Sequence, residues 1–213
     1  MKKHALLTAL LTTSLVLSGT ALAAGGYGKG KNRMQNQSVQ STITTVESDD
    51  MKYMREEEKL ARDVYLTLDQ YWGDQTNVFG NIAVSEEKHT STVDYILDKF
   101  GVEDPVVNDT IGVFATPYFQ ETYDALVERG RVSLIEGLRV GGYIEEKDMQ
   151  DILAAISRTD ERAINIAYSN LLDGSKSHLR AFVRVLENKG VPYEAQILEQ
   201  EEVNLILEDD SRM

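Results

Sequence analysis

From Ser48 onward, hydrophobic residues recur every three or four positions along most of the chain, which is the spacing of one face of an α-helix. Glycines, prolines and capping residues interrupt this pattern, and they mark the expected helix ends. The pattern predicts helices over about residues 49–71, 76–100, 117–129, 133–156, 160–188 and 193–207. No segment alternates convincingly as a β-strand does. We therefore expect an all-α fold, a helical bundle with additional short helices.

The second predicted helix carries two polar residues on its hydrophobic stripe. Glu86 and His89 occupy stripe positions between Ile82 and Val93. Residues three apart on a helix project from the same face. Burying a bare carboxylate costs several kcal/mol unless a partner compensates its charge. The position of Glu86 and His89 therefore predicts either a metal ligand pair or a hydrogen-bonded ion pair.

Three other predicted helices carry similar residues on their stripes. His178 lies on the stripe of the helix over 160–188, and Glu145 lies on that of the helix over 133–156, with Asp148 one turn further on. The first helix places either Glu57 or Glu58 on its stripe, and the pattern alone does not separate these two. Carboxylates combined with imidazoles suit iron, manganese or zinc, and helical bundles can hold two such metals bridged by glutamates.

Some polar residues near these stripes have other expected roles. Glu146 falls beside its stripe and is predicted to be exposed to solvent. Tyr65, Tyr143 and Tyr168 are expected mainly as core residues with hydrogen-bonded hydroxyls. Four charged residues are candidates for orienting the imidazoles, with surface ion pairs as the alternative: Arg62, Asp63, Asp151 and Arg180.

The N-terminus has the pattern of a secretory signal peptide. Lys2 and Lys3 precede a hydrophobic run, and Ala21-Leu22-Ala23 is a typical cleavage site, so cleavage is predicted after Ala23. An N-terminal membrane anchor is the alternative. Residues 24–47 are rich in Gly, Ser, Gln and Asn and predict a flexible linker before a helical domain over 48–208. The mature protein is thus expected to be secreted or periplasmic, with no membrane segment after cleavage.

Charge and composition exclude several classes of function. The formal net charge is −13, which argues against a nucleic-acid or anionic-membrane partner. The chain has no cysteine, so disulfides, thiolate metal sites and a cysteine nucleophile are excluded.

Two motifs resemble the metal-binding helices of rubrerythrin and other ferritin-like proteins. Phe-x-x-Ile-Ala-x-x-Glu-x-x-His is matched by Phe79, Ile82, Ala83, Glu86 and His89. The partner motif, Glu-x-x-Ala-x-x-x-Tyr, is matched by Glu58, Ala61 and Tyr65, and this match favours Glu58 over Glu57.

The stretches "MREEEKLARDVY", "IEEKDMQDI" and "GSKSHLRAF" together are similar to the ferritin-like family DUF2202, over about residues 50–205. The resemblance implies a ferritin-like four-helix bundle with a di-iron site. The ligands that it implies are Glu58, Glu86, His89, Glu145 and His178, with Glu58 and Glu145 bridging two irons.

The last helix departs from the ferritin-like pattern. Ser175 stands where that pattern has a glutamate, so one carboxylate is missing, and Asp148 is the candidate to replace it. Without that replacement, the site would hold one metal or bind the second weakly. The cysteine-ligated iron centre of full rubrerythrins is absent.

These observations predict an exported metal protein, with about two Fe per chain and Mn or Zn as alternatives. Its expected chemistry is oxidation of Fe(II) by O₂ or peroxide, or removal of peroxide. Two rivals remain: a metal-binding module that sequesters or senses metal without turnover, and a metal-free helical interaction protein with a buried polar network. The expected assembly is a monomer or homodimer.

Overall fold

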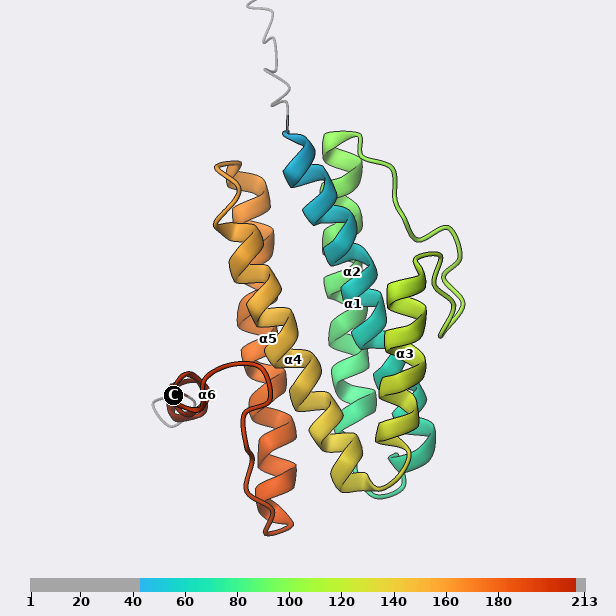
Figure 1. The fold of residues 1–213 in the computed structure, drawn as a ribbon, viewed down its shortest axis with the longest axis vertical. Helices are drawn as coiled ribbons and strands as arrows, with labels where there is room; N and C mark the ends of the chain where they lie inside the picture. The colour runs from blue at the N-terminus through green and yellow to red at the C-terminus, as the bar shows by residue number, and fades with distance from the viewer. Residues whose placement is uncertain (1–42, 210–213) are drawn as a thin grey trace, which may run out of the picture. The chain divides into compact units, whose positions relative to one another are not determined.

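The structure, a computed structural model, describes residues 43–209, and within that range every regular element is an α-helix. The prediction of an all-α fold is confirmed. The predicted signal peptide and most of the predicted linker lie outside the described residues. The helices are α1 (Thr45–Trp72), α2 (Val78–Phe100), α3 (Pro117–Gly130), α4 (Leu134–Ile156), α5 (Arg162–Asn188) and α6 (Gln200–Asp209), as Figure 1 shows.

Helix α1 begins earlier than the hydrophobic pattern predicts, inside the segment expected to be linker. A capping box explains this start: the Glu47 amide donates to Thr44 Oγ1 at 3.2 Å, and the Thr44 amide donates to Glu47 Oε2 at 2.7 Å. The Thr159 hydroxyl also donates to Glu47 Oε1 at 2.5 Å. This bond ties the start of α1 to the turn that precedes α5.

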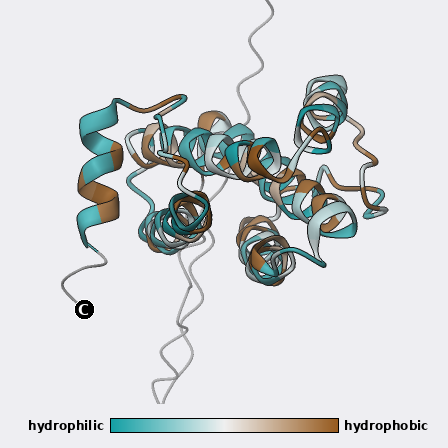
Figure 2. Ribbon diagram, turned by 90° about the horizontal axis from the view of Figure 1, so that it is seen from below, coloured by the Kyte–Doolittle hydropathy of each residue, from teal (hydrophilic) through white to brown (hydrophobic). Residues whose placement is uncertain are grey.

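The four long helices contact one another in a ring. Helix α1 packs along α2, and α4 packs along α5; α2 also contacts α5, and α1 contacts α4 (Figure 1). Helix α3 packs against α1 and α4, whereas α6 lies crosswise to the long helices (Figures 1 and 2). Figure 2 shows hydrophobic stretches of the long helices turned toward their neighbours. Among the described helices, none has both the length and the hydrophobicity that crossing a membrane requires.

A polar layer divides the hydrophobic core between the long helices. One core cluster includes Val64, Ile82, Leu138 and Phe182, and the other includes Met54, Val93, Ile152 and Leu171. On every long helix, a buried polar segment lies between the residues of these two clusters. The buried polar residues of this layer are Glu58, Glu86, Glu145, Asp148, Ser175 and His178.

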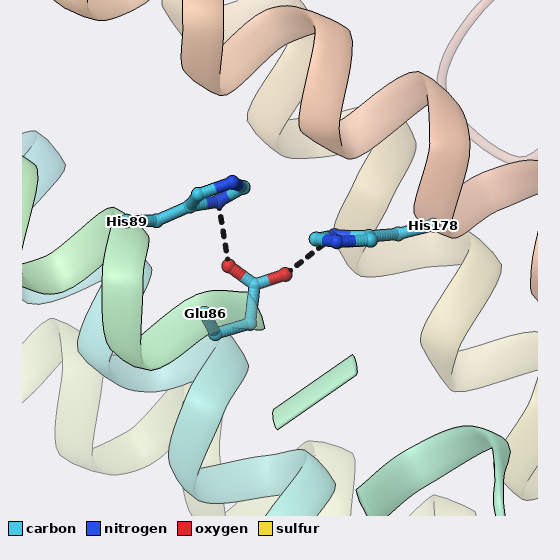
Figure 3. Close-up of side chains that lie close together, drawn as sticks. All are labelled: Glu86, His89 and His178. Atoms are coloured by element: carbon cyan, nitrogen blue, oxygen red, sulfur yellow. Dashed lines mark ion pairs between the residues drawn. The ribbon is translucent and has the colours of Figure 1, made fainter. Parts of the chain in front are cut away.

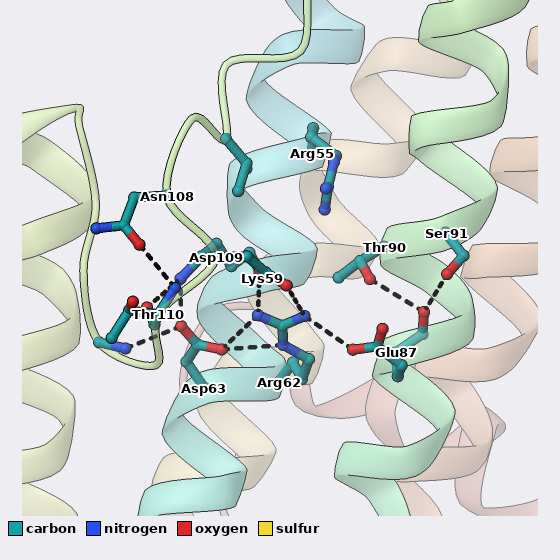
Figure 4. Close-up of polar contacts among 12 residues, drawn as sticks. Arg55, Lys59, Arg62, Asp63, Glu87, Thr90, Ser91, Asn108, Asp109 and Thr110 are labelled. Carbon is teal, nitrogen blue, oxygen red and sulfur yellow. Dashed lines mark hydrogen bonds and ion pairs between the residues drawn. The ribbon is translucent and has the colours of Figure 1, made fainter.

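The long loop between α2 and α3 is held to α1 by buried charges. Lys59 Nζ donates to Asp63 Oδ2 at 2.5 Å and to the Thr110 carbonyl at 3.1 Å, and the Gly112 amide donates to Asp63 at 2.9 Å (Figure 4). Gly112 has a φ of +74°, which favours glycine. Because Lys59 and Asp63 are both fully buried, pairing offsets much of their desolvation cost.

Arg62 extends this network to α2. Its guanidinium contacts Glu87 at 2.8 Å and Asp109 at 2.5 Å, as well as neighbouring Asp63 (Figure 4). Two residues that the sequence offered as partners for the imidazoles, Arg62 and Asp63, thus anchor the loop instead.

Glu146 is fully buried, so the prediction that it is exposed to solvent is wrong. Its carboxylate accepts hydrogen bonds from the Tyr193 hydroxyl at 2.6 Å and from three successive backbone amides, those of Gln196, Ile197 and Leu198. This segment wraps around the carboxylate as an irregular chain. The last helix therefore begins at Gln200, and not near Tyr193 as the pattern predicts.

We predict that Glu146→Ala releases the segment that precedes α6. The variant leaves three backbone amides without their charged acceptor, so we expect a loss of about 3 kcal/mol in the free energy of unfolding. Urea denaturation measures this loss, and hydrogen exchange should show lost protection at the amides of Gln196–Leu198. Glu194→Ala, an exposed glutamate of the same segment, is the control. Unchanged protection in Glu146→Ala would contradict the assigned role.

Candidate metal centre

One carboxylate lies between two imidazoles at the middle of the polar layer. Glu86 Oε2 is 2.9 Å from Nδ1 of His89 on the same helix, and Glu86 Oε1 is 2.7 Å from Nδ1 of His178 on α5 (Figure 3). The two imidazole rings are stacked with their centroids 5.3 Å apart. Glu86, His89 and His178 each offer a ligand atom, and these atoms lie within 4.8 Å of one another. Two helices thus bring together a set of metal-binding side chains.

Helices α1 and α4 each add a further carboxylate. Glu58 Oε2 of α1 is 3.3 Å from His89 Nδ1, and Glu145 Oε2 of α4 is 3.5 Å from His178 Nδ1. Each imidazole therefore faces Glu86 and one carboxylate of its own. The structure brings together five of the side chains that the sequence singled out.

Asp148 lies in the same buried layer, beside the residue that interrupts the expected motif. The Ser175 hydroxyl donates to Asp148 Oδ2 at 2.5 Å and to the Leu171 carbonyl at 2.9 Å. Asp148 is only 5% exposed. A carboxylate from α4 thus lies at the position on α5 where the expected glutamate is absent.

Close packing fixes the groups around the centre. A Cβ atom at Gly174 would come within 2.5 Å of the His89 ring, so α5 needs glycine there to let the imidazole approach. The Tyr65 hydroxyl donates to Glu145 Oε1 at 2.5 Å, and the Tyr65 ring packs on Phe182. Tyr65 is therefore a hydrogen-bond partner of the centre as well as a core residue.

Other expected neighbours of the centre have different partners. Asp151 contacts Lys147 and accepts a hydrogen bond from Tyr53, and Arg180 donates to the Ile206 carbonyl and to Ser177. The Tyr168 hydroxyl is buried and has no hydrogen-bond partner. None of these contacts orients an imidazole.

The family resemblance favoured Glu58 over Glu57 as a metal ligand, but the structure buries both side chains. Glu57 is 6% exposed, and its Oε2 atom has no hydrogen-bond partner. Burial raises the pKa of Glu57, and the nearby charges of Asp148 and Asp151 raise it further. The residues from Glu56 to Tyr65 are all buried, because α2, α3 and α4 surround this part of α1. A hydrophobic pattern that assumes one buried face could not predict the burial of both glutamates. The run of three consecutive glutamates within this helix was the available signal in the sequence.

The charges in the centre shift its pKa values in opposite directions. Burial alone would raise the pKa of Glu86, but contact with the two imidazoles outweighs it and lowers the pKa to about 2. Burial alone would lower the pKa of both imidazoles, but the carboxylates raise it to about 11 for His89 and about 10 for His178. In the metal-free protein, both imidazoles are therefore cationic at neutral pH.

The outer carboxylates have raised pKa values. Burial raises the pKa of Glu58 well above its usual value, with the charge of Asp148 as the next cause. Burial also raises the pKa of Glu145, against the effect of His178. Burial raises the pKa of Asp148 to about 7, although the hydrogen bond from Ser175 opposes the shift. The positive charges of the two imidazoles therefore do not fully compensate the negative charges of the buried carboxylates.

Several buried atoms of the centre lack hydrogen bonds. Both Nδ1 atoms lie within ion-pair distance of Glu86, but their angles are not those of hydrogen bonds. Buried polar atoms almost always have a hydrogen-bond partner, so such a group needs an explanation. The atoms of the centre without a hydrogen-bond partner are Glu58 Oε1, Asp148 Oδ1, His89 Nδ1 and His178 Nδ1.

The raised pKa of Asp148 predicts a pH-dependent stability of the metal-free protein. The folded protein keeps this proton up to about pH 7, whereas the unfolded chain releases it near 3.8. Folding therefore takes up a proton between these values, and the free energy of unfolding falls as pH rises, by at most about 1.4 kcal/mol per pH unit for one proton. Glu58 and Glu145 contribute in the same direction.

Urea denaturation in the presence of a chelator, at a series of pH values across this range, measures the slope. We expect a smaller decline in Asp148→Asn than in the unmodified protein. Asp173→Asn, which changes an exposed carboxylate of α5, is the control and should leave the slope unchanged. Equal slopes in all three proteins would contradict the assignment.

Comparison with known proteins identifies the family of this chain. Residues 47–210 match the model of an uncharacterised protein domain, DUF2202. The chain is 47% identical over 165 residues to the uncharacterised protein MJ0754 of Methanocaldococcus jannaschii, covering 78% of this chain and 88% of that protein. The crystal structure of hypothetical protein MJ0754 from Methanococcus jannaschii superimposes with a TM-score of 0.76 at 46% identity, covering 78% of this chain and 94% of that one. The chain belongs to the DUF2202 family.

Proposed function

We propose that this protein is a ferritin-like metal protein whose centre holds two iron ions. The observation that carries the proposal is the Glu86 carboxylate, which lies between imidazoles of two different helices. A carboxylate with one oxygen toward each of two imidazoles can bridge two metal ions, with one imidazole on each.

The donor set fits such ions. Oxygen and imidazole ligands suit iron, and they also suit manganese or zinc. The buried atoms without hydrogen bonds are of the types that ligate metals: carboxylate oxygens and imidazole nitrogens. A cation would also compensate the excess of buried carboxylates over imidazoles.

The side chains divide into two sets around Glu86. Glu58 and His89 would hold one ion, because these two side chains lie beside each other. Glu145 and His178 would hold the other ion for the same reason. The family resemblance implies Glu58 and Glu145 as bridges, but the distances favour Glu86 in that role. Asp148 would supply the carboxylate that α5 lacks, with Ser175 holding it in place.

When bound, Fe(II) would supply the electrons that reduce O₂ or peroxide, so that the iron is oxidised and peroxide is removed in the same reaction. The chain's own residues would hold and orient the ligands. Tyr65 donates a hydrogen bond to Glu145 and so fixes the orientation of that carboxylate. The imidazoles are the most exposed side chains of the centre: the His89 side chain is 12% and the His178 side chain 9% exposed, whereas Glu58, Glu86 and Glu145 are at most 2% exposed. O₂ or peroxide would therefore approach between α2 and α5.

The remaining parts of the proposal concern where the protein acts. Residues 1–23 would direct export, and the mature protein would act outside the cytoplasm, secreted or periplasmic, as a monomer or homodimer. Its partners would be metal ions and O₂ or peroxide, and its acidic charge disfavours nucleic acid.

A second candidate function is metal binding without turnover. The serine at position 175 and the absence of cysteine favour it, because α5 itself contributes no carboxylate to the centre and the chain has no thiolate electron-transfer centre. In that case the protein would sequester or sense Fe, Mn or Zn.

Metal content per chain tests the proposal. The protein is purified without chelator, and elemental analysis should find about two Fe per chain. Glu86→Gln should lose most of this metal, whereas Glu87→Gln, a change at the adjacent exposed carboxylate, should retain it. About two Fe with Fe(II) oxidation would support the enzyme. One Zn or Mn without oxidation would support the binding module. No metal, even after reconstitution, would overturn both and leave a buried polar network.

A further inference from the structure

A small cavity lies between α1, α3 and α4, next to the candidate centre. Its volume is about 20 Å³, enough for one water molecule or one ion. Glu57 and Lys147 line it together with aromatic and aliphatic side chains, Tyr53 and Tyr118 among them. The cavity is therefore mostly apolar, with one buried carboxylate and one ammonium.

One carboxylate oxygen of Glu57, Oε2, lacks a hydrogen-bond partner. Glu57 is 6% exposed. Asp148 and Asp151 of α4 lie close enough for their charges to act on Glu57. Asp148 in turn acts on Glu58 of the centre. Glu57 directly precedes Glu58 of the centre on α1, and Asp148 and Asp151 lie about one turn apart on α4, so carboxylates continue from the cavity to the centre. Two of them, Glu57 and Asp148, have an oxygen without a hydrogen bond.

A surface groove lies on the other side of Tyr53. It has a volume of about 340 Å³, and Asp49, Asp50 and Asp151 line it together with Arg158. Arg158 pairs with Asp50. Tyr53 lines both the groove and the cavity, and its hydroxyl donates to Asp151 at 3.0 Å. Tyr53 is therefore shared by the groove and by the cavity that Glu57 lines.

Lys147 supplies the positive charge beside Glu57 and Asp151. Its ammonium pairs with Asp151, and its side chain is 27% exposed, so it has room to turn outward. A divalent cation prefers carboxylate oxygens as ligands, and it would compete with the ammonium for Asp151 and Glu57.

We propose that Glu57 and Asp151 form a loading site for a divalent cation on its way to the metal centre, and that the cation replaces the Lys147 ammonium there. The inference rests on the proposed metal centre. Asp148, which lies beside both Glu57 and Glu58, then receives the cation. Lys147 restrains loading, because its charge opposes an incoming cation.

The rate of Co(II) uptake tests this inference, because the visible absorbance of Co(II) changes when imidazole binds. Stopped-flow mixing of the metal-free protein with Co(II) gives the rate, and elemental analysis gives the final stoichiometry. We expect Glu57→Gln to slow uptake by about tenfold and Lys147→Gln to accelerate it severalfold, with unchanged stoichiometry. A destabilised fold would not slow uptake in one variant and accelerate it in the other. Opposite changes in the uptake rate therefore distinguish a loading role from general destabilisation.

The controls are Glu187→Gln and Lys189→Gln, which make the same charge changes on exposed residues at the far end of α5. Both should leave the rate unchanged. Asp151→Asn, at a less buried position, should also slow uptake and serves if Glu57→Gln does not fold. Uptake rates unaffected by Glu57→Gln and Asp151→Asn, or slowed by Lys147→Gln, would overturn the loading site while the metal centre stands. No Co(II) uptake by the unmodified protein would overturn the centre itself.

Discussion

The contact of Glu86 with two imidazoles is the interaction on which the rest of the molecule depends. It places one carboxylate of α2 between His89 of the same helix and His178 of α5. Because these helices belong to different closely packed pairs, α1 with α2 and α4 with α5, the contact joins the two halves of the helical ring. The two imidazoles lower the pKa of Glu86, while Glu58 and Glu145, together with Glu86, raise the pKa values of His89 and His178.

A buried polar layer needs support from both sides. Hydrophobic clusters lie above and below it along the long helices, and they exclude water from the carboxylates. Lys59, Arg62 and Asp63 hold the α2–α3 loop against the outside of α1, while Glu146 holds the segment before α6 against α4. Among the described residues, the group around Glu86 is the one that combines imidazoles with carboxylates.

Hydrophobic periodicity predicted the six described helices, although not all of their ends, and it singled out Glu86, His89, Glu145 and His178 as polar residues on hydrophobic stripes. Glu86, His89 and His178 interrupt regular stripes, and such interruptions are conspicuous in a 3.6-residue pattern. The stripe could not separate Glu57 from Glu58, because a helix surrounded on several sides buries residues all round its circumference. It also misplaced Glu146, whose burial depends on backbone amides from a distant irregular segment. The start of α1 depended on a local capping box, which hydrophobic periodicity does not detect.

We propose that Glu86 would hold two metal ions together with His89 and His178. Anomalous X-ray diffraction at the iron absorption edge, on crystals of the protein loaded with Fe(II) in the absence of oxygen, tests it most directly. The account predicts two anomalous peaks, one between Glu86 and His89 and the other between Glu86 and His178. Imidazole–carboxylate contacts that persist in iron-loaded crystals without an anomalous peak at Glu86 would contradict it.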